Sequence, residues 1–358
     1  MNFRFLASIS PVILLAILLV SLPPVSFSAG PQAPSRPTSS VEPSPPWSAP
    51  LGMTILLMGE DPPARFPANL QWARQLGFDW IQISFPAYQR RFDSTNFPIE
   101  DHRSPSLESL SDAIICAKNA GMQVALHPLL LIQDPLDPHW RGQLKPDHRS
   151  RWFESYKRWI LDLAQLAQQH QVDLFFIGSE LSSMQRDTVR WNHIIEQVRL
   201  SFSGWISYSA NWDDWQQIEF ARHLDALGLN GYIPLATDPH DRNEALIARW
   251  LPFRSQIHRW TVQSGIPVFF SELGFPAHSL GLKEPWNHTV QLPADPWIQA
   301  RGYQSFFDTF SADPHLQGVF FYALHMDGGE QDPSYTPAGK PAQHLIRAFL
   351  QHGKGKSR

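Results

Sequence analysis

From residue 51 onward, short apolar runs rich in β-branched and aromatic residues alternate with longer segments of helical periodicity. Strands that are connected by helices and share a sheet are parallel, and they are apolar throughout because both of their faces are buried. The eight apolar runs that predict strands are residues 53–58, 80–85, 122–127, 172–178, 205–210, 226–232, 266–272 and 316–323.

The segments between these runs carry helical signals. Gly77 and Gly121 each follow one of them, as expected for the left-handed residue after a helix. We expect Pro252 to kink or split the helix in which it lies. The predicted helices are residues 69–76, 106–120, 151–170, 188–202, 243–264, 297–310 and 340–352.

Eight strand–helix units within about 300 residues predict an α/β fold, a single (β/α)8 TIM barrel over residues 51–352. A doubly wound parallel sheet is the alternative. It has no support from a dinucleotide-binding motif, because no G-x-G-x-x-G sequence follows an early strand.

The N-terminal segment predicts export. Arg4 precedes a mostly apolar run over residues 6–20, and helix-breaking prolines and small residues follow, as in a signal peptide covering residues 1–28. The apolar run is shorter than the roughly 20 residues that a membrane span needs, so an uncleaved anchor is only the alternative. Residues 29–50 are rich in proline and serine and predict an extended linker, and residues 353–358 form a polar tail. We therefore expect a secreted, periplasmic or cell-envelope protein.

Composition and charge narrow the function. The 358-residue chain has a net charge of −4, so the basic surface of a nucleic-acid-binding protein is absent. Its one cysteine, Cys116, excludes an internal disulfide and a zinc site built on thiolates. The 14 tryptophans weakly favour flat ligands such as sugars. We expect a monomer with no metal or organic cofactor.

Two strongly apolar strands end in a glutamate. Glu180 follows the fourth run and Glu272 ends the seventh. A carboxylate in such a place costs desolvation energy unless it has partners or a task. Because the active site of a TIM barrel lies at the C-terminal ends of its strands, the two carboxylates can converge on one bound group. Retaining glycoside hydrolysis uses two such carboxyls about 5–5.5 Å apart.

Further candidates for binding a carbohydrate lie at strand ends and in long loops. Aromatic faces pack against the C–H side of sugar rings, and binding residues gather in loops. The strand-end candidates are His127, Asn211, Trp212, Tyr322 and His325, and the loop candidates are Trp140, Arg141 and Trp286.

Eight short motifs in order along residues 53–352 carry a family resemblance. They are PHWRG (138–142), IGSEL (177–181), SYSANW (207–212), LGLNGYIPL (227–235), FSELGF (270–275), PW (285–286), QARGYQSF (299–306) and TPAGKPA (336–342). Through them the chain resembles retaining glycoside hydrolases of the clan with the acid/base after strand 4 and the nucleophile after strand 7. Within that clan it is most similar to family 113, whose described members are β-mannanases.

The resemblance implies a role for three residues. Glu180 would be the acid/base, Glu272 the nucleophile, and Tyr232 a hydrogen-bond donor that orients Glu272. The charge of ionised Glu272 would favour the protonated form of Glu180. The implied reaction is double displacement on a β-linked, mannan-like polysaccharide or oligosaccharide.

Several positions depart from the family pattern. Ser179 stands where many clan members have asparagine, and Tyr322 or His325 must replace a tryptophan under the reacting sugar. An exported carbohydrate-binding barrel without catalytic activity is therefore the alternative function. A metal-dependent hydrolase is disfavoured, because no H-x-H sequence follows the first strand.

Overall fold

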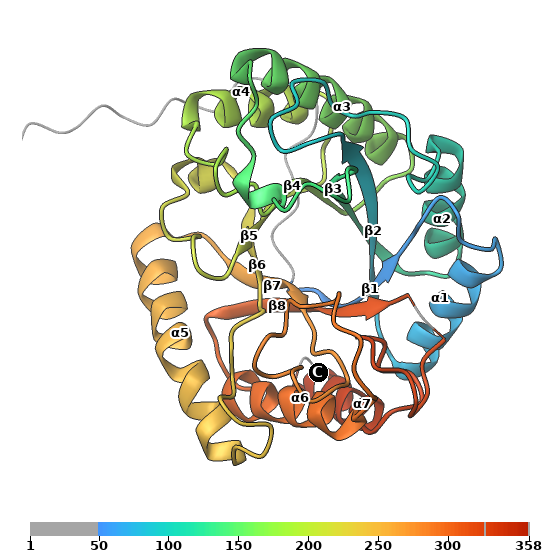
Figure 1. Ribbon diagram of the computed structural model, residues 1–358, viewed down its shortest axis with the longest axis vertical. Helices are drawn as coiled ribbons and strands as arrows, with labels where there is room; N and C mark the ends of the chain where they lie inside the picture. Colours follow the sequence, from blue (N-terminus) through green and yellow to red (C-terminus); the bar gives the residue numbers. More distant parts are fainter. Residues whose placement is uncertain (1–48, 326, 357–358) are drawn as a thin grey trace, which may run out of the picture. The chain divides into compact units, whose positions relative to one another are not determined.

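The computed structural model describes residues 49–325 and 327–356. In this part of the chain, eight parallel strands close into a barrel in chain order, with helices outside the ring (Figure 1). The predicted (β/α)8 TIM barrel is confirmed. The strands are β1 (Leu51–Leu56), β2 (Trp80–Gln89), β3 (Gln123–Ile132), β4 (Leu174–Ser179), β5 (Trp205–Asn211), β6 (Ala226–Asn230), β7 (Val268–Leu273) and β8 (Leu316–Leu324).

Each predicted helix is present. Gly77 caps the first with a left-handed φ of 112°, as expected. The helix that contains Pro252 is continuous, so the proline does not split it. The last helix extends to Lys356 and thus includes part of the expected polar tail. The helices are α1 (Arg65–Leu76), α2 (Leu107–Asn119), α3 (Arg149–Gln169), α4 (Thr188–Arg199), α5 (Asn243–Ser264), α6 (Pro296–Phe310) and α7 (Pro341–Lys356), with short 3-10 helices η1 (Arg141–Gln143) and η2 (Glu219–His223).

Two predicted N-terminal segments lie outside the described residues. These are the signal peptide, residues 1–28, and nearly all of the linker, residues 29–50. Among the helices that the structure describes, none combines the length and the apolar character required to cross a membrane.

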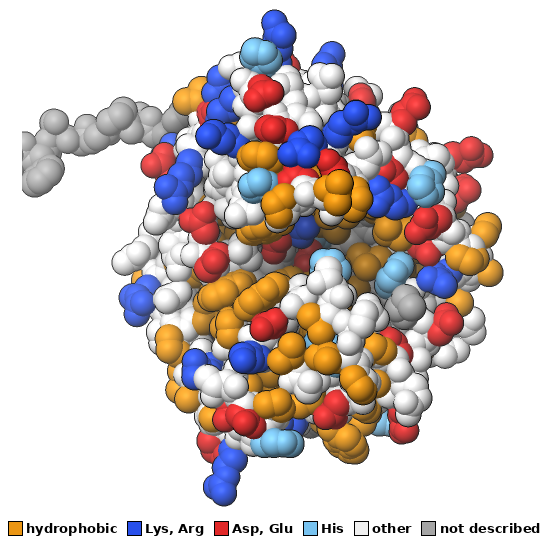
Figure 2. Space-filling model, viewed as in Figure 1, with side chains coloured by type: hydrophobic (Ala, Val, Ile, Leu, Met, Phe, Trp, Pro, Cys, Tyr) orange, Lys and Arg blue, Asp and Glu red, His pale blue; other side chains and the backbone are white. Residues whose placement is uncertain are grey.

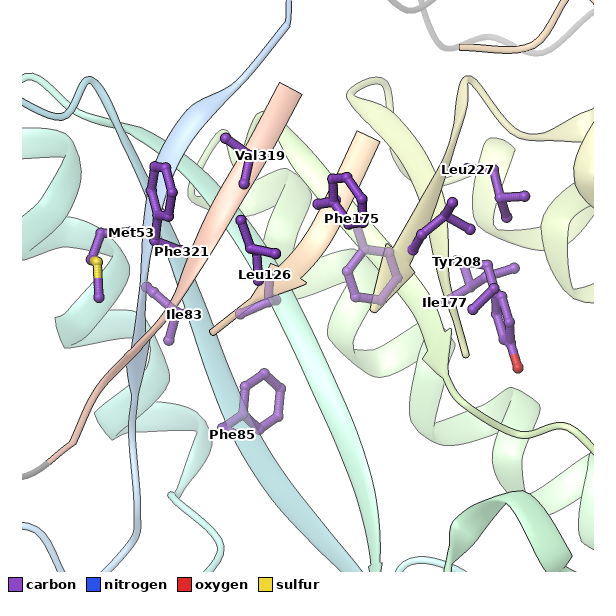
Figure 3. Packing of buried hydrophobic residues seen from close by; sticks show 14 of the residues in the cluster. Met53, Ile83, Phe85, Leu126, Phe175, Ile177, Tyr208, Leu227, Val319 and Phe321 are labelled. Atoms are coloured by element: carbon purple, nitrogen blue, oxygen red, sulfur yellow. The ribbon is translucent and has the colours of Figure 1, made fainter. Parts of the chain in front are cut away.

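The outer side chains of the strands pack against the helices (Figure 3). The ring of Phe321 on β8 lies 5.9 Å from that of Phe307 on α6 and 6.1 Å from that of Phe349 on α7. The ring centroid of Tyr208 on β5 lies 5.5 Å from that of Trp191 on α4. These contacts fix the helices around the barrel.

The interior of the barrel is layered. Eight apolar side chains at the lower level form a cluster of their own, in which Trp80 and Trp205 stack with ring centroids 5.8 Å apart. Above this apolar floor lies a layer of fully buried polar side chains: Thr54, Gln82, Ser84, His127, Ser207, Ser209, Asn230 and Ser271. This polar layer supports the mouth of the barrel from below.

Strand β7 changes register just before its glutamate. Leu229 of β6 pairs with Phe270, but the next residue, Asn230, pairs with Glu272. Such a bulge adds a residue to one strand and redirects the side chain that follows. As a result, the neighbouring residues Ser271 and Glu272 both make interior contacts, which the alternation of a regular strand would forbid.

The apolar floor yields a stability prediction. Phe320 is fully buried between Trp80 and Phe269, so Phe320→Ala should lower the free energy of unfolding by about 3–5 kcal/mol through lost burial and a cavity. Val262 is 73% exposed, and Val262→Ala should change the free energy of unfolding by less than about 0.5 kcal/mol. Equilibrium denaturation measures both, and equal losses would contradict the packing described.

Candidate active site

Glu180 follows β4 at a second change of register. Phe176 pairs with Ser207, but Ser179 pairs with Ser209, so β4 contains an extra residue. The Glu180 backbone has a left-handed φ of 53°, which is rare for residues other than glycine, and its N–H donates to the Ser209 carbonyl at 2.8 Å. An unfavourable backbone conformation of this kind is common at functional sites.

The Glu180 side chain has a polar partner at each carboxyl oxygen. Asn230 Nδ2 donates to Oε1 at 2.7 Å, and Arg141 Nη2 lies 2.9 Å from Oε2 in an ion pair. The carboxyl is only 8% exposed and the Arg141 side chain 17%. Both oxygens of Glu180 are therefore held in place by contacts from other segments of the chain.

The segment that carries Arg141 is fastened to the loop that carries Glu180. In that loop, the Ser183 N–H donates to the Gly142 carbonyl at 3.0 Å, and the Ser183 hydroxyl donates to the Leu144 carbonyl at 2.7 Å. Gly142 lies so close to the Trp140 ring that an added Cβ would be 2.3 Å from it. These contacts fix the position of the Arg141 segment relative to the Glu180 loop.

Asn230 was not among the residues predicted from sequence. The hydroxyls of Ser209 and Ser271 lie 2.6 and 3.0 Å from its Oδ1, so its amide nitrogen faces Glu180. A signal was present, because Asn230 is a polar residue within the sixth apolar run. From that run the sequence predicted a functional role for Tyr232 alone.

Glu272 is almost completely buried at the end of β7. The Tyr232 hydroxyl donates to its Oε2 at 2.6 Å, whereas Oε1 has no hydrogen-bond partner among the described residues. Burial and the nearby charge of Glu180 raise the pKa of Glu272 to about 8, against the opposing effects of Arg141 and Tyr232.

His127 lies in the polar layer, fully buried, with Nδ1 3.8 Å from Glu272 Oε1. The same nitrogen lies 2.8 Å from the Ser84 hydroxyl and 3.3 Å from the Gln82 amide. Burial lowers the pKa of His127 to about 3, so the ring is neutral at neutral pH. His127 thus lies beneath Glu272 as an uncharged neighbour, without the exposure expected of a sugar-contacting residue.

Two further tyrosines, Tyr322 and Tyr335, lie beside the hydrogen bond from Tyr232 to Glu272. The Tyr232 ring lies 6.0 Å from that of Tyr322 and 6.1 Å from that of Tyr335, and the latter two are 5.3 Å apart. Tyr335 was not predicted, since it comes from the long loop after β8. Its hydroxyl donates to the Pro285 carbonyl and so brings the Trp286 segment to the same side of the barrel.

The remaining aromatic candidates differ in exposure. Trp140 and Trp286 are 40% and 46% exposed, as a ring that receives a ligand must be. Trp212 is partly buried and packs against the hydrophobic core. Figure 2 shows a hollow over the centre of the barrel, with charged side chains within it and apolar side chains on its rim.

Asn211 and His325 do not contact the two glutamates. Asn211 donates to Asp213 at 2.8 Å, at the C-terminal end of β5. The His325 carbonyl accepts from Arg65 at 2.8 Å, and burial lowers the pKa of its ring. Of the two candidates for the missing tryptophan, the structure brings Tyr322 to the site.

Within the described ranges, no cluster of three or more His, Cys, Asp or Glu side chains is arranged to bind a metal. The chemistry of the site is that of two carboxyls, one guanidinium and a phenol.

The sequence profile of Glycoside Hydrolase Family 113 matches residues 65–339. The chain belongs to Glycoside Hydrolase Family 113. It is accordingly a glycosidase. No curated protein matches it in sequence.

Solved structures, including two of family 113, share the fold. A GH113 β-mannanase from Alicyclobacillus acidocaldarius, in complex with ManMIm, superposes with a TM-score of 0.77 at 20% identity, covering 86% of this chain and 98% of its own. A GH113 β-1,4-mannanase gives 0.75 at 21% identity, with 85% and 99% covered. An endo-β-1,4-mannanase from Thermotoga petrophila gives 0.54 at 14% identity, with 87% and 78% covered.

The contact between Arg141 and Glu180 was not predicted from sequence, because Arg141 lies far from both glutamates along the chain. The expected effect of ionised Glu272 on Glu180 stays a prediction.

The Tyr232 hydrogen bond predicts a pH effect. This bond lowers the pKa of Glu272, so Tyr232→Phe should raise that pKa further and leave less Glu272 carboxylate at neutral pH. We expect the acid limb of kcat/KM to move to higher pH and the rate at pH 6 to fall roughly 10- to 100-fold, the value of one charge-assisted bond.

Tyr335→Phe is the matched control. It removes a phenol oxygen from the same aromatic cluster, but that oxygen donates to a backbone carbonyl and not to Glu272. Equal shifts of the acid limb in both variants would contradict the role assigned to Tyr232.

Proposed function

We propose that this family 113 glycosidase cleaves a β-linked, mannan-like polysaccharide or oligosaccharide with retention of configuration. The observation that carries the proposal is the convergence of Glu180 and Glu272, from β4 and β7, on one barrel mouth where the charge of Glu180 raises the pKa of Glu272. The β-mannanases of similar fold support mannan as the first substrate to test.

In the first step, Glu272 forms a bond to the anomeric carbon while Glu180 gives a proton to the glycosidic oxygen, and the bond between that carbon and oxygen breaks. Tyr232 occupies Glu272 Oε2. The oxygen without a partner, Oε1, is therefore the one that attacks. The hydrogen bond fixes which lone pairs face the sugar.

In the second step, Glu180 takes a proton from water, and the resulting hydroxyl displaces Glu272 from the anomeric carbon. Arg141 and Asn230 hold the Glu180 carboxyl in position for this step. Two displacements on opposite faces of the sugar restore the original configuration.

The sugar is proposed to contact the aromatic residues of the mouth. Trp140 and Trp286 present exposed rings, and Tyr322 lies beside Tyr232 near the nucleophile. Such rings pack against the C–H faces of pyranoses. Asn211 and Trp212, at the end of β5, are proposed to extend this surface.

We further propose that the protein is exported. The order of residues 1–28, a charged residue followed by an apolar run and then small residues, supports export. The lack of an internal disulfide is compatible with export.

The test is hydrolysis of β-1,4-linked manno-oligosaccharides and cello-oligosaccharides by the full chain. We expect turnover of the manno-series and loss of at least about 1000-fold in Glu272→Gln, because no covalent intermediate can form. Glu244→Gln, an exposed change at the start of α5, serves as the control and should retain activity.

Product configuration tests the mechanism. Proton NMR during hydrolysis should show the β-anomer first, before mutarotation. An α-anomer would overturn retention. Binding of oligosaccharide without hydrolysis of any substrate would instead favour a carbohydrate-binding barrel.

A further inference from the structure

We propose that Gln299 is a positioning residue for sugar binding, which holds together two loops at the mouth and thereby places Trp286 on its rim. Gln299 lies on α6, outside the ring of strands (Figure 1). The two loops are residues 274–295, here the β7 loop, and residues 332–336, here the β8 loop. The inference rests on the proposed function, because it takes a sugar as the ligand of Trp286.

The Gln299 side chain is fully buried and joins the two loops with one amide group. Its Nε2 donates to the Phe275 carbonyl of the β7 loop and to the Tyr335 carbonyl of the β8 loop, both at 2.9 Å. A longer contact of 3.4 Å reaches the Ser334 carbonyl. An amide nitrogen has two hydrogens, and the two shorter bonds use both. Gln299 therefore bridges backbone groups that are far apart in the chain.

The surroundings determine the orientation of this amide. Gln299 Oε1 is buried and has no hydrogen-bond partner among the described residues. Rotation of the amide by 180° would turn this oxygen toward the carbonyls of Phe275 and Tyr335, which are acceptors as well. A buried oxygen without a partner costs free energy, so the bonds made by Nε2 outweigh that cost in the folded protein. The amide thus serves as a donor to the two loops.

The two loops approach each other through glycine and backbone groups. A Cβ added to Gly274, which directly follows β7, would lie 2.3 Å from the Tyr322 carbonyl oxygen and 3.0 Å from the Tyr335 ring. The Ala277 N–H donates to the Pro333 carbonyl at 2.8 Å. The loops are therefore in direct contact, and the position of one constrains the other.

A buried lysine secures the β8 loop from its other side. Lys340 Nζ donates to the Ser334 carbonyl at 2.9 Å and to Asp332 at 3.3 Å. Asp332 accepts from the Ser334 N–H at 2.8 Å and from its hydroxyl at 2.7 Å. The Thr336 hydroxyl donates to the Ala323 carbonyl on β8 at 3.2 Å. These bonds define the shape of the β8 loop, so a contact at one point of the loop sets the position of the rest.

Tyr335 connects the β8 loop to the rim of the mouth. Its hydroxyl donates to the carbonyl of Pro285, the residue directly before Trp286. The Trp286 side chain is 46% exposed, whereas the Tyr335 ring packs 5.3 Å from that of Tyr322. The exposed tryptophan thus depends for its place on a partly buried tyrosine, and Gln299 holds the backbone of that tyrosine.

Gln299 makes no hydrogen bond to the reacting groups. Its partners are backbone carbonyls, and the hydrogen bond to Glu272 comes from Tyr232. A displaced Trp286 would weaken the binding of the sugar in the ground state and in the transition state alike. Loss of such uniform binding raises KM and leaves kcat unchanged.

Gln299→Met removes the donor and nearly retains the volume of the side chain. We expect KM for β-1,4-linked mannotetraose to rise roughly 10-fold, and kcat to change by less than about 3-fold. Gln304→Met is the matched control, because Gln304 lies on the same helix and donates to Asp308 of that helix. It should leave both constants unchanged.

A double-mutant cycle separates positioning from a general loss of structure. Trp286→Ala removes the ring that Gln299 places, so adding Gln299→Met to it should raise KM no further. Multiplication of the two separate effects would overturn the proposal, because independent sites behave in that way. Tyr335→Phe removes only the hydroxyl that reaches Pro285, so it tests the same connection even if Gln299→Met does not fold. An unchanged KM in Tyr335→Phe would also overturn the proposal.

Fluorine-19 NMR of protein labelled with 5-fluorotryptophan tests the placement without turnover. The resonance lost in Trp286→Phe identifies Trp286. Gln299→Met should shift this resonance in the free protein, and Gln304→Met should not. An unshifted resonance in folded Gln299→Met would refute this inference alone. A shifted resonance in a protein that hydrolyses no mannotetraose would refute the proposed function and leave the placement of Trp286 by Gln299 standing.

Discussion

The mouth of this barrel is governed by one electrostatic constraint: the buried carboxyls of Glu180 and Glu272 interact through their charges where little water reaches them. Both cannot be ionised without a large cost. The surrounding groups divide the cost unequally, since Glu180 has a cation and an amide donor, whereas Glu272 has one phenol and a free oxygen. This asymmetry gives chemically identical side chains different properties, as acid/base chemistry with two carboxyls requires.

The asymmetry depends on the layered interior. The apolar floor closes the barrel from below and leaves the next level for polar side chains that satisfy one another. Ser209 and Ser271 orient Asn230, and Asn230 orients Glu180. The chain of contacts crosses β4, β5, β6 and β7, so closure of the barrel itself fixes the position of Glu180.

The barrel is shared with solved structures of the family, and its mouth is lined by this chain's own side chains. Structures of about 20% identity share the barrel, which the strands and helices specify through their apolar patterns. At the mouth, Tyr322 of β8 meets Tyr335 and Trp286 of two loops through packing and one hydrogen bond to a backbone carbonyl. The shared architecture thus carries a barrel mouth with its own side chains.

The sequence by itself determined the order of strands and helices, the barrel, and the two glutamates, because burial on both faces of a parallel strand leaves an apolar run that a carboxylate visibly ends. It also indicated Tyr232, through a family motif. The tertiary structure alone decided how these residues act. Register changes in β4 and β7 are invisible in the alternation of the sequence, yet they direct Glu180 and Glu272.

The same holds for contacts between distant segments. Arg141 was expected to bind sugar, and only folding brings it to Glu180; His325 was expected at the site, and folding places it beside Arg65. Asn230 acquires its role from two serines on other strands. Apolar periodicity is a local property that one chain segment records, whereas the protonation of a buried pair depends on charges and donors that meet only when the barrel closes.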